Sequence, residues 1–157
     1  MTYLRYALVA LLGFTFPAAA DSPRVIASLG QHLEARSTEG YIRYLGSPVF
    51  WKFQPVIGLS VAGNGSGWAG AGTAVTWRAQ EAAGIFLRAS TMAGVYRRGS
   101  GPYLGGPIQF RTALDLGVSQ QGGMEFGLGV DHRSNAGIYK TNPGRNSVYL
   151  FASMALK

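Results

Sequence analysis

Apolar and polar residues alternate along most of the chain with a period of two. The pattern is clearest from Ile108 to Ser119, where nearly every second residue is apolar and the residues between are polar or small. The same alternation runs from Met124 to Asp131 and from Ile85 to Ser90. Successive side chains of a strand point to opposite faces, so this period predicts β-strands with one apolar face. No helical period of 3.6 competes with it after residue 20.

The alternation predicts eight strands, at residues 24–33, 38–45, 50–62, 67–78, 84–95, 107–119, 123–133 and 147–156. Most are long enough to cross a bilayer when tilted, which takes about 9–11 residues. The connections after the second, fourth and sixth strands are short, whereas those at about 96–106 and 134–146 are longer. An even number of strands, with short turns at one end and longer loops at the other, is typical of bacterial outer-membrane barrels.

Composition indicates which face of these strands meets lipid. Only 13% of the residues are charged and 23 are glycine, against about 25% charged residues in ordinary soluble domains. The polar faces carry mostly Gly, Ala and Ser, with a few charges at Arg88, Arg111, Asp115 and Glu125. A narrow barrel interior needs small residues and paired charges, whereas a surface in water would carry many Lys and Glu. We therefore predict an all-β fold, an eight-stranded antiparallel transmembrane β-barrel, with a soluble lipocalin-like carrier as the alternative.

Several aromatic residues lie near the ends of the predicted strands. Their positions suggest the interfacial belts of membrane proteins, with ordinary core packing as the alternative. These residues are Trp51, Trp68, Trp77, Tyr96 and Tyr103.

The N-terminus has the features of a secretory signal peptide. Arg5 precedes an apolar run from Ala7 to Phe16, and Ala18–Ala20 forms a small-residue cleavage site before Asp21. We predict a signal peptide at 1–20 and one barrel domain at 21–157. The exported part keeps 13 of the 14 Lys and Arg residues against 7 Asp and Glu, a net charge of +6, and has no cysteine. A basic exported chain favours anionic partners such as lipid phosphates, and we expect no nucleic acid partner.

Candidate chemistry is concentrated at the end of the seventh predicted strand. His132 and Ser134 have the same parity as Met124, Phe126, Leu128 and Val130, so both should project from the lipid face. A polar pair facing lipid is costly, and a nucleophile with its base would gain from it if the substrate is itself a lipid. Backbone N–H groups at Asn135 and Gly137, or the Asn142 side chain, could stabilise an oxyanion. The alternative is that His132 is a polar interfacial residue without a catalytic role. The second histidine, His32, is isolated near the end of the first predicted strand.

The remaining motifs do not point to a cofactor. Gly65–Gly70 fits G-x-G-x-x-G but falls in a hairpin, and no Cys/His cluster has zinc spacing. We expect neither a cofactor nor a metal. Basic residues of the outward loops could contact lipid phosphates or could simply be solvated. They are Arg97, Arg98, Lys140 and Arg145.

The string His132-Arg133-Ser134-Asn135-Ala136-Gly137, after an alternating strand and before one last strand, resembles the PagL family of lipid A 3-O-deacylases. The resemblance implies an eight-stranded outer-membrane barrel that hydrolyses the ester-linked acyl chain at the 3 position of lipid A. It also implies that His132 is the base and Ser134 the nucleophile, on the outer wall of the barrel. The resemblance implies a glutamate as the third residue of the catalytic triad. Counting from the motif, the corresponding position in this chain is Asn146. An asparagine can orient the imidazole but brings no charge.

The sequence therefore predicts a serine esterase of the outer membrane that acts on lipid A within lipopolysaccharide. The first alternative is a barrel of the same fold that is weak or inactive as a catalyst and has a structural or lipid-binding role, which Asn146 supports. The sequence leaves open whether the chain pairs as a homodimer.

Overall fold

A computed structural model describes residues 22–34, 36–79 and 83–156. The predicted signal peptide at 1–20 lies outside the described residues. Within the described ranges, no helix is long and apolar enough to cross a membrane.

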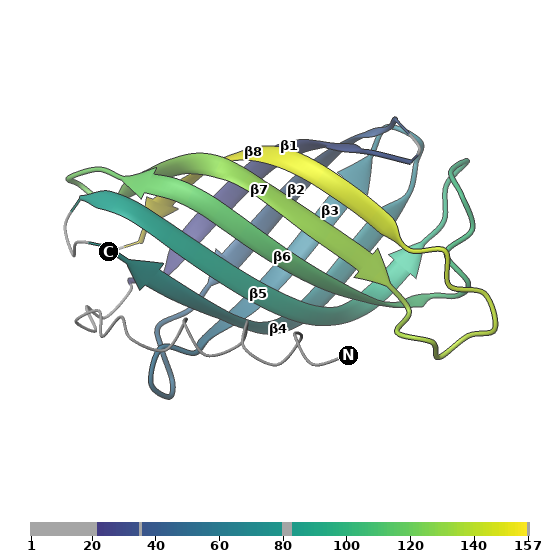
Figure 1. Ribbon diagram of the computed structural model, residues 1–157, viewed down its shortest axis with the longest axis horizontal. Helices are drawn as coiled ribbons and strands as arrows, with labels where there is room; N and C mark the ends of the chain where they lie inside the picture. Colours follow the sequence, from purple (N-terminus) through teal and green to yellow (C-terminus); the bar gives the residue numbers. More distant parts are fainter. Residues whose placement is uncertain (1–21, 35, 80–82, 157) are drawn as a thin grey trace, which may run out of the picture.

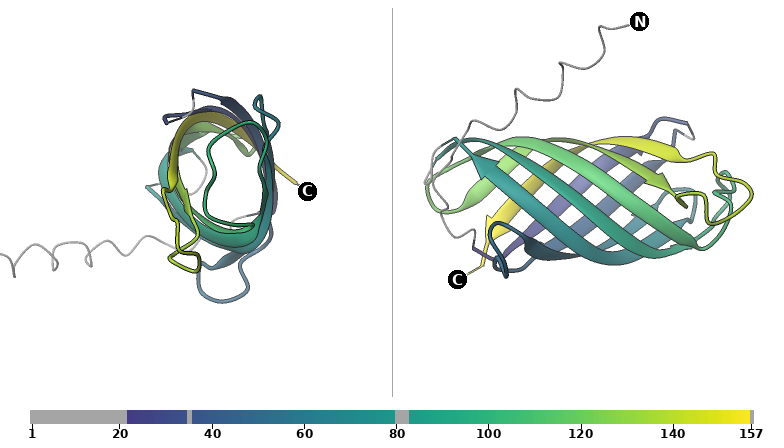
Figure 2. Two further views of the ribbon diagram at one scale, coloured as in Figure 1. Left: turned by 90° about the vertical axis from the view of Figure 1, so that its right-hand side faces the viewer. Right: turned by 60° about the horizontal axis from the view of Figure 1, so that its bottom comes forward.

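Eight antiparallel strands close into a barrel (Figure 1). Each strand pairs with its neighbours in the sequence, and β1 pairs with β8 to complete the ring seen end-on in Figure 2. The predicted fold is thus confirmed. The strands are β1 (Arg24–His32), β2 (Thr38–Leu45), β3 (Gln54–Ala62), β4 (Gly67–Arg78), β5 (Gly84–Arg97), β6 (Ile108–Ser119), β7 (Met124–Ser134) and β8 (Arg145–Ala155).

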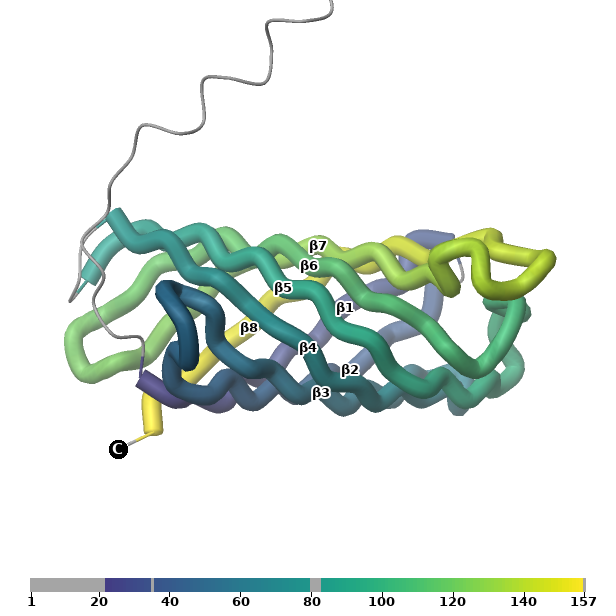
Figure 3. The backbone as a smooth tube through the Cα atoms, turned by 90° about the horizontal axis from the view of Figure 1, so that it is seen from below, coloured from purple at the N-terminus to yellow at the C-terminus, as the bar shows by residue number. Residues whose placement is uncertain are grey.

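The two ends of the barrel differ. The β5–β6 and β7–β8 connections lie together at one end, and the C-terminal end of β8 lies at the other (Figure 3). The β2–β3 connection, at the end nearer to the C-terminus, is longer than predicted because β3 begins at Gln54 rather than at residue 50. Trp51 has a left-handed φ of 49°, and the Phe53 N–H donates to the Phe50 carbonyl. The chain therefore reverses there, and Trp51 belongs to a turn.

The outer face of the barrel is apolar. Arg88, Arg111, Asp115 and Glu125 are at most 1% exposed and point inward, as the alternation predicted. An apolar belt around a closed barrel matches lipid rather than water, which argues against the soluble carrier. The outward residues include Leu29, Ile42, Ile57, Leu59, Val61, Ile85, Val95, Leu114, Leu116, Val118, Leu128, Val130 and Leu150.

The lumen is filled with aromatic rings as well as charges. The prediction of an interfacial belt is wrong for Trp68 and Tyr96, which are 1% and 5% exposed and lie inside the barrel. A place near a strand end does not fix which face a ring takes. Glycines make the room for rings in the lumen: a Cβ at Gly70 would collide with the Trp68 ring, and one at Gly129 would collide with the Tyr149 ring.

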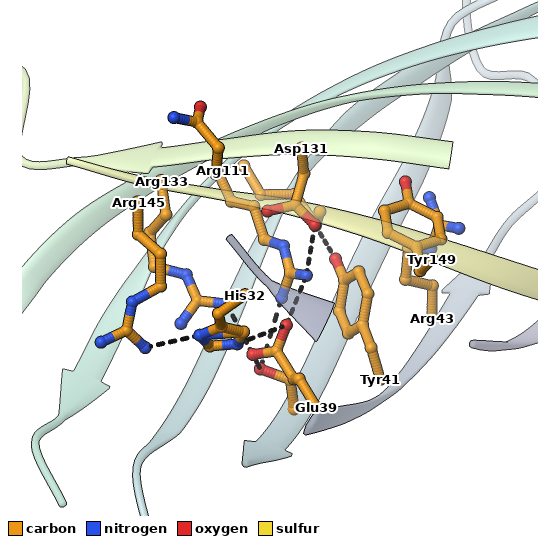
Figure 4. A network of polar contacts seen from close by, with 12 residues as sticks. His32, Glu39, Tyr41, Arg43, Arg111, Asp131, Arg133, Arg145 and Tyr149 are labelled. Atoms are coloured by element: carbon orange, nitrogen blue, oxygen red, sulfur yellow. Dashed lines mark hydrogen bonds and ion pairs between the residues drawn. The ribbon is translucent and has the colours of Figure 1, made fainter. Parts of the chain in front are cut away.

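Arginines and carboxylates cross the lumen as paired charges (Figure 4). Arg111 donates to Glu39 at 2.8 Å and also to Asp131, and Arg133 donates to Glu39 at 2.7 Å. Buried charges of this kind are costly unless paired. The network ties Asp131 and Arg133 of β7 to β2 and β6, and it therefore fixes which side chains of β7 face outward.

Candidate active site

The end of β7 presents two polar side chains on the outer wall. Asp131 and Arg133 are buried in the lumen, whereas His132 between them is exposed and Ser134 is half-buried. β7 continues to Ser134, one residue further than predicted, so both side chains belong to one regular strand. The structure thus places His132 and Ser134 on the same outward face, two residues and about 6.8 Å of strand apart.

Asn146 faces His132 from the neighbouring strand. β8 begins at Arg145, two residues earlier than predicted, and its register pairs Asn146 with His132. The Asn146 Oδ1 lies 2.9 Å from the His132 Nδ1. An amide oxygen only accepts hydrogen bonds, so this contact requires a proton on Nδ1. When the ring is neutral, the His132 Nε2 is then the nitrogen without a proton, which is the form that a general base needs.

The Ser134 hydroxyl makes no hydrogen bond within the described ranges. Such a hydroxyl is free to rotate toward a partner. Catalytic hydrogen bonds commonly shorten only when substrate binds. The serine is thus held on the correct face, with its proton not committed to another acceptor.

The β7–β8 connection begins with a residue that organises the loop. Asn135 is fully buried, and its Nδ2 donates to the carbonyls of Leu104 and Thr141 at 3.0 and 2.7 Å. Its Oδ1 accepts from the Gly137 N–H, and its own N–H donates to the Asn142 Oδ1, both at 3.0 Å. The backbone N–H groups predicted as oxyanion donors are therefore already used. Among the three candidates, the Asn142 Nδ2 is the donor that has no partner in the described part of the chain.

Gly144 brings the backbone close beneath the imidazole. A Cβ at this position would lie 2.9 Å from the His132 Cε1, and the φ of +70° is one that other residues rarely adopt. The loop therefore needs a glycine here to let His132 lie against β8.

Sequence reasoning missed Glu34, in the β1–β2 connection. Its carboxylate accepts from the Asn146 N–H at 3.0 Å and from the Asn146 Nδ2 at 2.7 Å. Burial raises the pKa of Glu34, but the hydrogen bond from the Asn146 backbone and further hydrogen bonds outweigh it and hold the pKa below its usual value. The signal that could have found this residue is barrel closure, because pairing β1 with β8 brings the end of the first strand beside the start of the last.

An apolar groove runs down the outer wall from this site. A hollow of about 450 Å³ includes His132, Asn146 and Leu33 in its lining, and an adjoining hollow of about 630 Å³ extends toward Leu128 and Leu150. The two share Leu114, Val130 and Val148. An elongated apolar groove beside a polar pair suits a long hydrocarbon chain.

The sequence model of the family described as "Lipid A 3-O-deacylase (PagL)" matches residues 12–155. The chain belongs to this family. PagL proteins are lipid A deacylases of the outer membrane, so the chain is a member of a hydrolase family with a membrane-embedded barrel.

Solved structures agree with the PagL fold. The crystal structure of the outer membrane enzyme PagL superposes with a TM-score of 0.71 at 19% identity, covering 85% of this chain and 99% of that one. A de novo designed transmembrane β-barrel gives 0.64 at 8% identity, covering 88% and 98%. Neisserial surface protein A gives 0.52 at 8% identity, covering 88% and 100%. No curated protein matches the sequence.

Two other predicted candidates lie elsewhere in this PagL-family barrel. His32 is not isolated: it is buried in the lumen, where Arg145 contacts its Nδ1 at 2.8 Å and Glu39 lies 3.5 Å from its Nε2 (Figure 4). The prediction that Arg145 is an outward loop residue is wrong, because β8 begins there and turns its side chain into the lumen. Arg97, Arg98 and Lys140 are exposed. In the described part of the chain, no group of three or more His, Asp or Glu side chains is placed to hold a metal.

Proposed function

We propose that this chain hydrolyses the ester that holds the acyl chain at the 3 position of lipid A, with Ser134 as nucleophile and His132 as general base. The observation that carries the proposal is the outward-facing His132, whose Nδ1 is engaged by Asn146 and whose Nε2 is left as an acceptor on the strand that carries Ser134. A base and a nucleophile on a lipid-facing wall can reach an ester that never leaves the membrane.

In the first step, the His132 Nε2 takes the proton of the Ser134 hydroxyl as its oxygen attacks the ester carbonyl. The Asn142 Nδ2 is the donor that we assign to the oxyanion, because the Asn135 and Gly137 N–H groups already hold the loop together. The bond to the sugar oxygen then breaks, and His132 returns its proton to that oxygen. The acyl chain is left on Ser134.

In the second step, water attacks the acyl-serine while His132 takes one of its protons. Ser134 recovers its proton from the imidazole, and a free 3-hydroxy fatty acid leaves. The groove lined by Leu114, Val130 and Val148 supports this assignment, because it gives the acyl chain an apolar path away from the site.

Mass spectrometry of lipid A from cells expressing the protein tests the proposal. We expect lipid A that has lost one 3-hydroxyacyl chain, and we expect that loss to disappear in Ser134→Ala and in His132→Ala. Thr91→Ala, which removes an exposed hydroxyl from β5, is the matched control and should keep the activity. An unchanged lipid A profile from folded wild-type protein would show that the barrel has a non-catalytic role.

A further inference from the structure

A chain of three side chains leads away from the candidate active site. The His132 Nδ1 contacts the Asn146 Oδ1 at 2.9 Å, and the Asn146 Nδ2 donates to Glu34 at 2.7 Å. We propose that Glu34 is a positioning residue, which selects the catalytic tautomer of His132 through Asn146 and supplies the negative charge that Asn146 lacks. The proposal rests on the esterase function proposed above.

Glu34 fixes the orientation of the Asn146 amide. An asparagine side chain can turn over and exchange its oxygen and nitrogen with little change of shape. A carboxylate only accepts hydrogen bonds, and Glu34 therefore binds the nitrogen end and repels the oxygen end. Glu34 also accepts from the Asn146 backbone N–H at 3.0 Å, which holds the carboxylate in place. The oxygen end must then face His132.

The orientation of the amide selects the tautomer of the His132 imidazole. An amide oxygen opposite Nδ1 stabilises the tautomer with its proton on Nδ1, and Nε2 is then free to take the Ser134 proton. An amide that had turned over would donate to Nδ1 and stabilise the tautomer protonated on Nε2. That tautomer cannot act as the base, and selecting the wrong tautomer at such a histidine costs several orders of magnitude in rate.

Glu34 also supplies a negative charge behind the Asn146 amide. When His132 takes the serine proton it becomes an imidazolium, and a neutral asparagine offers only its dipole. The Glu34 carboxylate lies on the far side of the same amide and polarises it, because hydrogen bonds in a chain strengthen one another. Burial raises the pKa of Glu34, but the hydrogen bonds from Asn146 and the other favourable interactions outweigh it and hold the pKa below its usual value, which favours the charged carboxylate.

Glu34 also has a structural role that the test must separate from this one. The Leu33 N–H donates to the Asn146 carbonyl at 3.0 Å, so the β1–β2 connection is fastened to β8 at the same place. Glu34→Gln keeps the size and an oxygen that can accept from Asn146, but loses the charge and can present an N–H instead. This variant removes the selection of the amide orientation while keeping the fastening.

Nitrogen-15 NMR of the histidines in detergent micelles reports the tautomer of His132, and through it the orientation of the Asn146 amide, without any need for activity. The chain has two histidines, and a spectrum of His132→Ala assigns the signals. We expect wild-type His132 to be protonated on Nδ1, and Glu34→Gln to show a mixture of the two tautomers. Arg36→Gln, which removes an exposed charge from the same connection, should match the wild type. A Glu34→Gln protein with an unchanged tautomer, or a wild type protonated on Nε2, would overturn the proposal.

Kinetics with purified lipid A test whether the Glu34 charge contributes to kcat. We expect Glu34→Gln to lower kcat by about 10- to 100-fold, as loss of a supporting hydrogen-bond partner does elsewhere, with little change in KM. Asn146→Glu places a carboxylate directly against His132. In that background Glu34→Gln should raise kcat rather than lower it, because the variant removes the repulsion between two adjacent carboxylates.

Equal losses of kcat from Glu34→Gln in both backgrounds would mean that Glu34 only fastens the two elements, and would overturn the proposal. The outcomes are distinct from failure of the proposed function. A wild type that leaves lipid A unchanged removes the esterase, whereas the tautomer of His132 still decides whether Glu34 orients the amide.

Discussion

The backbone at Gly144 leaves no room for a side chain beneath His132. Gly144→Ala would place a methyl group 2.9 Å from the His132 Cε1. The imidazole would have to move, and we expect a loss of most of the deacylase activity, measured as release of 3-hydroxy fatty acid from lipid A.

Gly122→Ala is the matched control for this prediction. Gly122 also has a positive φ, of +93°, but nothing lies within 4 Å of its added Cβ. Both variants therefore carry the backbone strain of roughly 1–2 kcal/mol, and only one of them meets the imidazole. Similar activities of the two variants would mean that the fit around His132 does not limit the reaction.

Residue parity was sufficient to find part of the site. His132 and Ser134 continue the alternation of β7, and the structure turns both outward. Glu34 could not be found in this way, because its contact with Asn146 spans 112 residues of sequence and exists only after β1 and β8 pair. A neighbour relation created by closure of a barrel leaves no local pattern.

At the scale of the elements, Asn135 joins the two longer connections. Its amide nitrogen donates to Leu104 in the β5–β6 connection and to Thr141 in the β7–β8 connection. Asn135→Ala would remove both hydrogen bonds, at a cost of about 0.5–1.5 kcal/mol each, although the Leu104 carbonyl would still accept from the Gln109 Nε2. Because Asn142 accepts from the Asn135 backbone in the same loop, we expect kcat to fall as the oxyanion donor loses its position.

Ser100→Ala controls for changes to these connections in general. It removes one exposed hydrogen bond, from Ser100 to the Asn64 carbonyl, and should leave kcat close to that of the wild type. If Asn135→Ala retains full kcat in a folded barrel, the loop does not need this residue to present Asn142.

Strand boundaries were predicted well where alternation is regular and poorly where chain geometry intervenes. The bounds of β2 and β4 match the prediction, whereas β3 starts late because of the turn at Trp51. β8 starts early, at Arg145, since a polar stretch that resembles a loop in sequence pairs with the end of β7. That early start is what brings Asn146 opposite His132.

At the scale of the whole molecule, one wall separates two kinds of polar chemistry. Inside, arginines such as Arg111 and Arg133 are neutralised by Glu39 and Asp131 across the lumen (Figure 4). Outside, His132 and Ser134 interrupt an apolar surface. The sequence predicted this division from parity and low charge. It did not predict the aromatic filling of the lumen, because a ring such as Trp68 depends on space that Gly70 of the same strand and Gly94 of β5 provide.

A lipophilic fluorophosphonate tests whether Ser134 is a nucleophile activated by His132 on the outer wall, because a nucleophilic serine oxygen displaces fluoride from its phosphorus. The folded barrel is treated with the reagent in detergent micelles, and the adduct is located by peptide mass spectrometry. We predict a phosphonate on Ser134 in the wild type and loss of that adduct in His132→Ala. A wild-type barrel without label on Ser134, or a label that persists in His132→Ala, would mean that His132 does not activate Ser134 as a nucleophile.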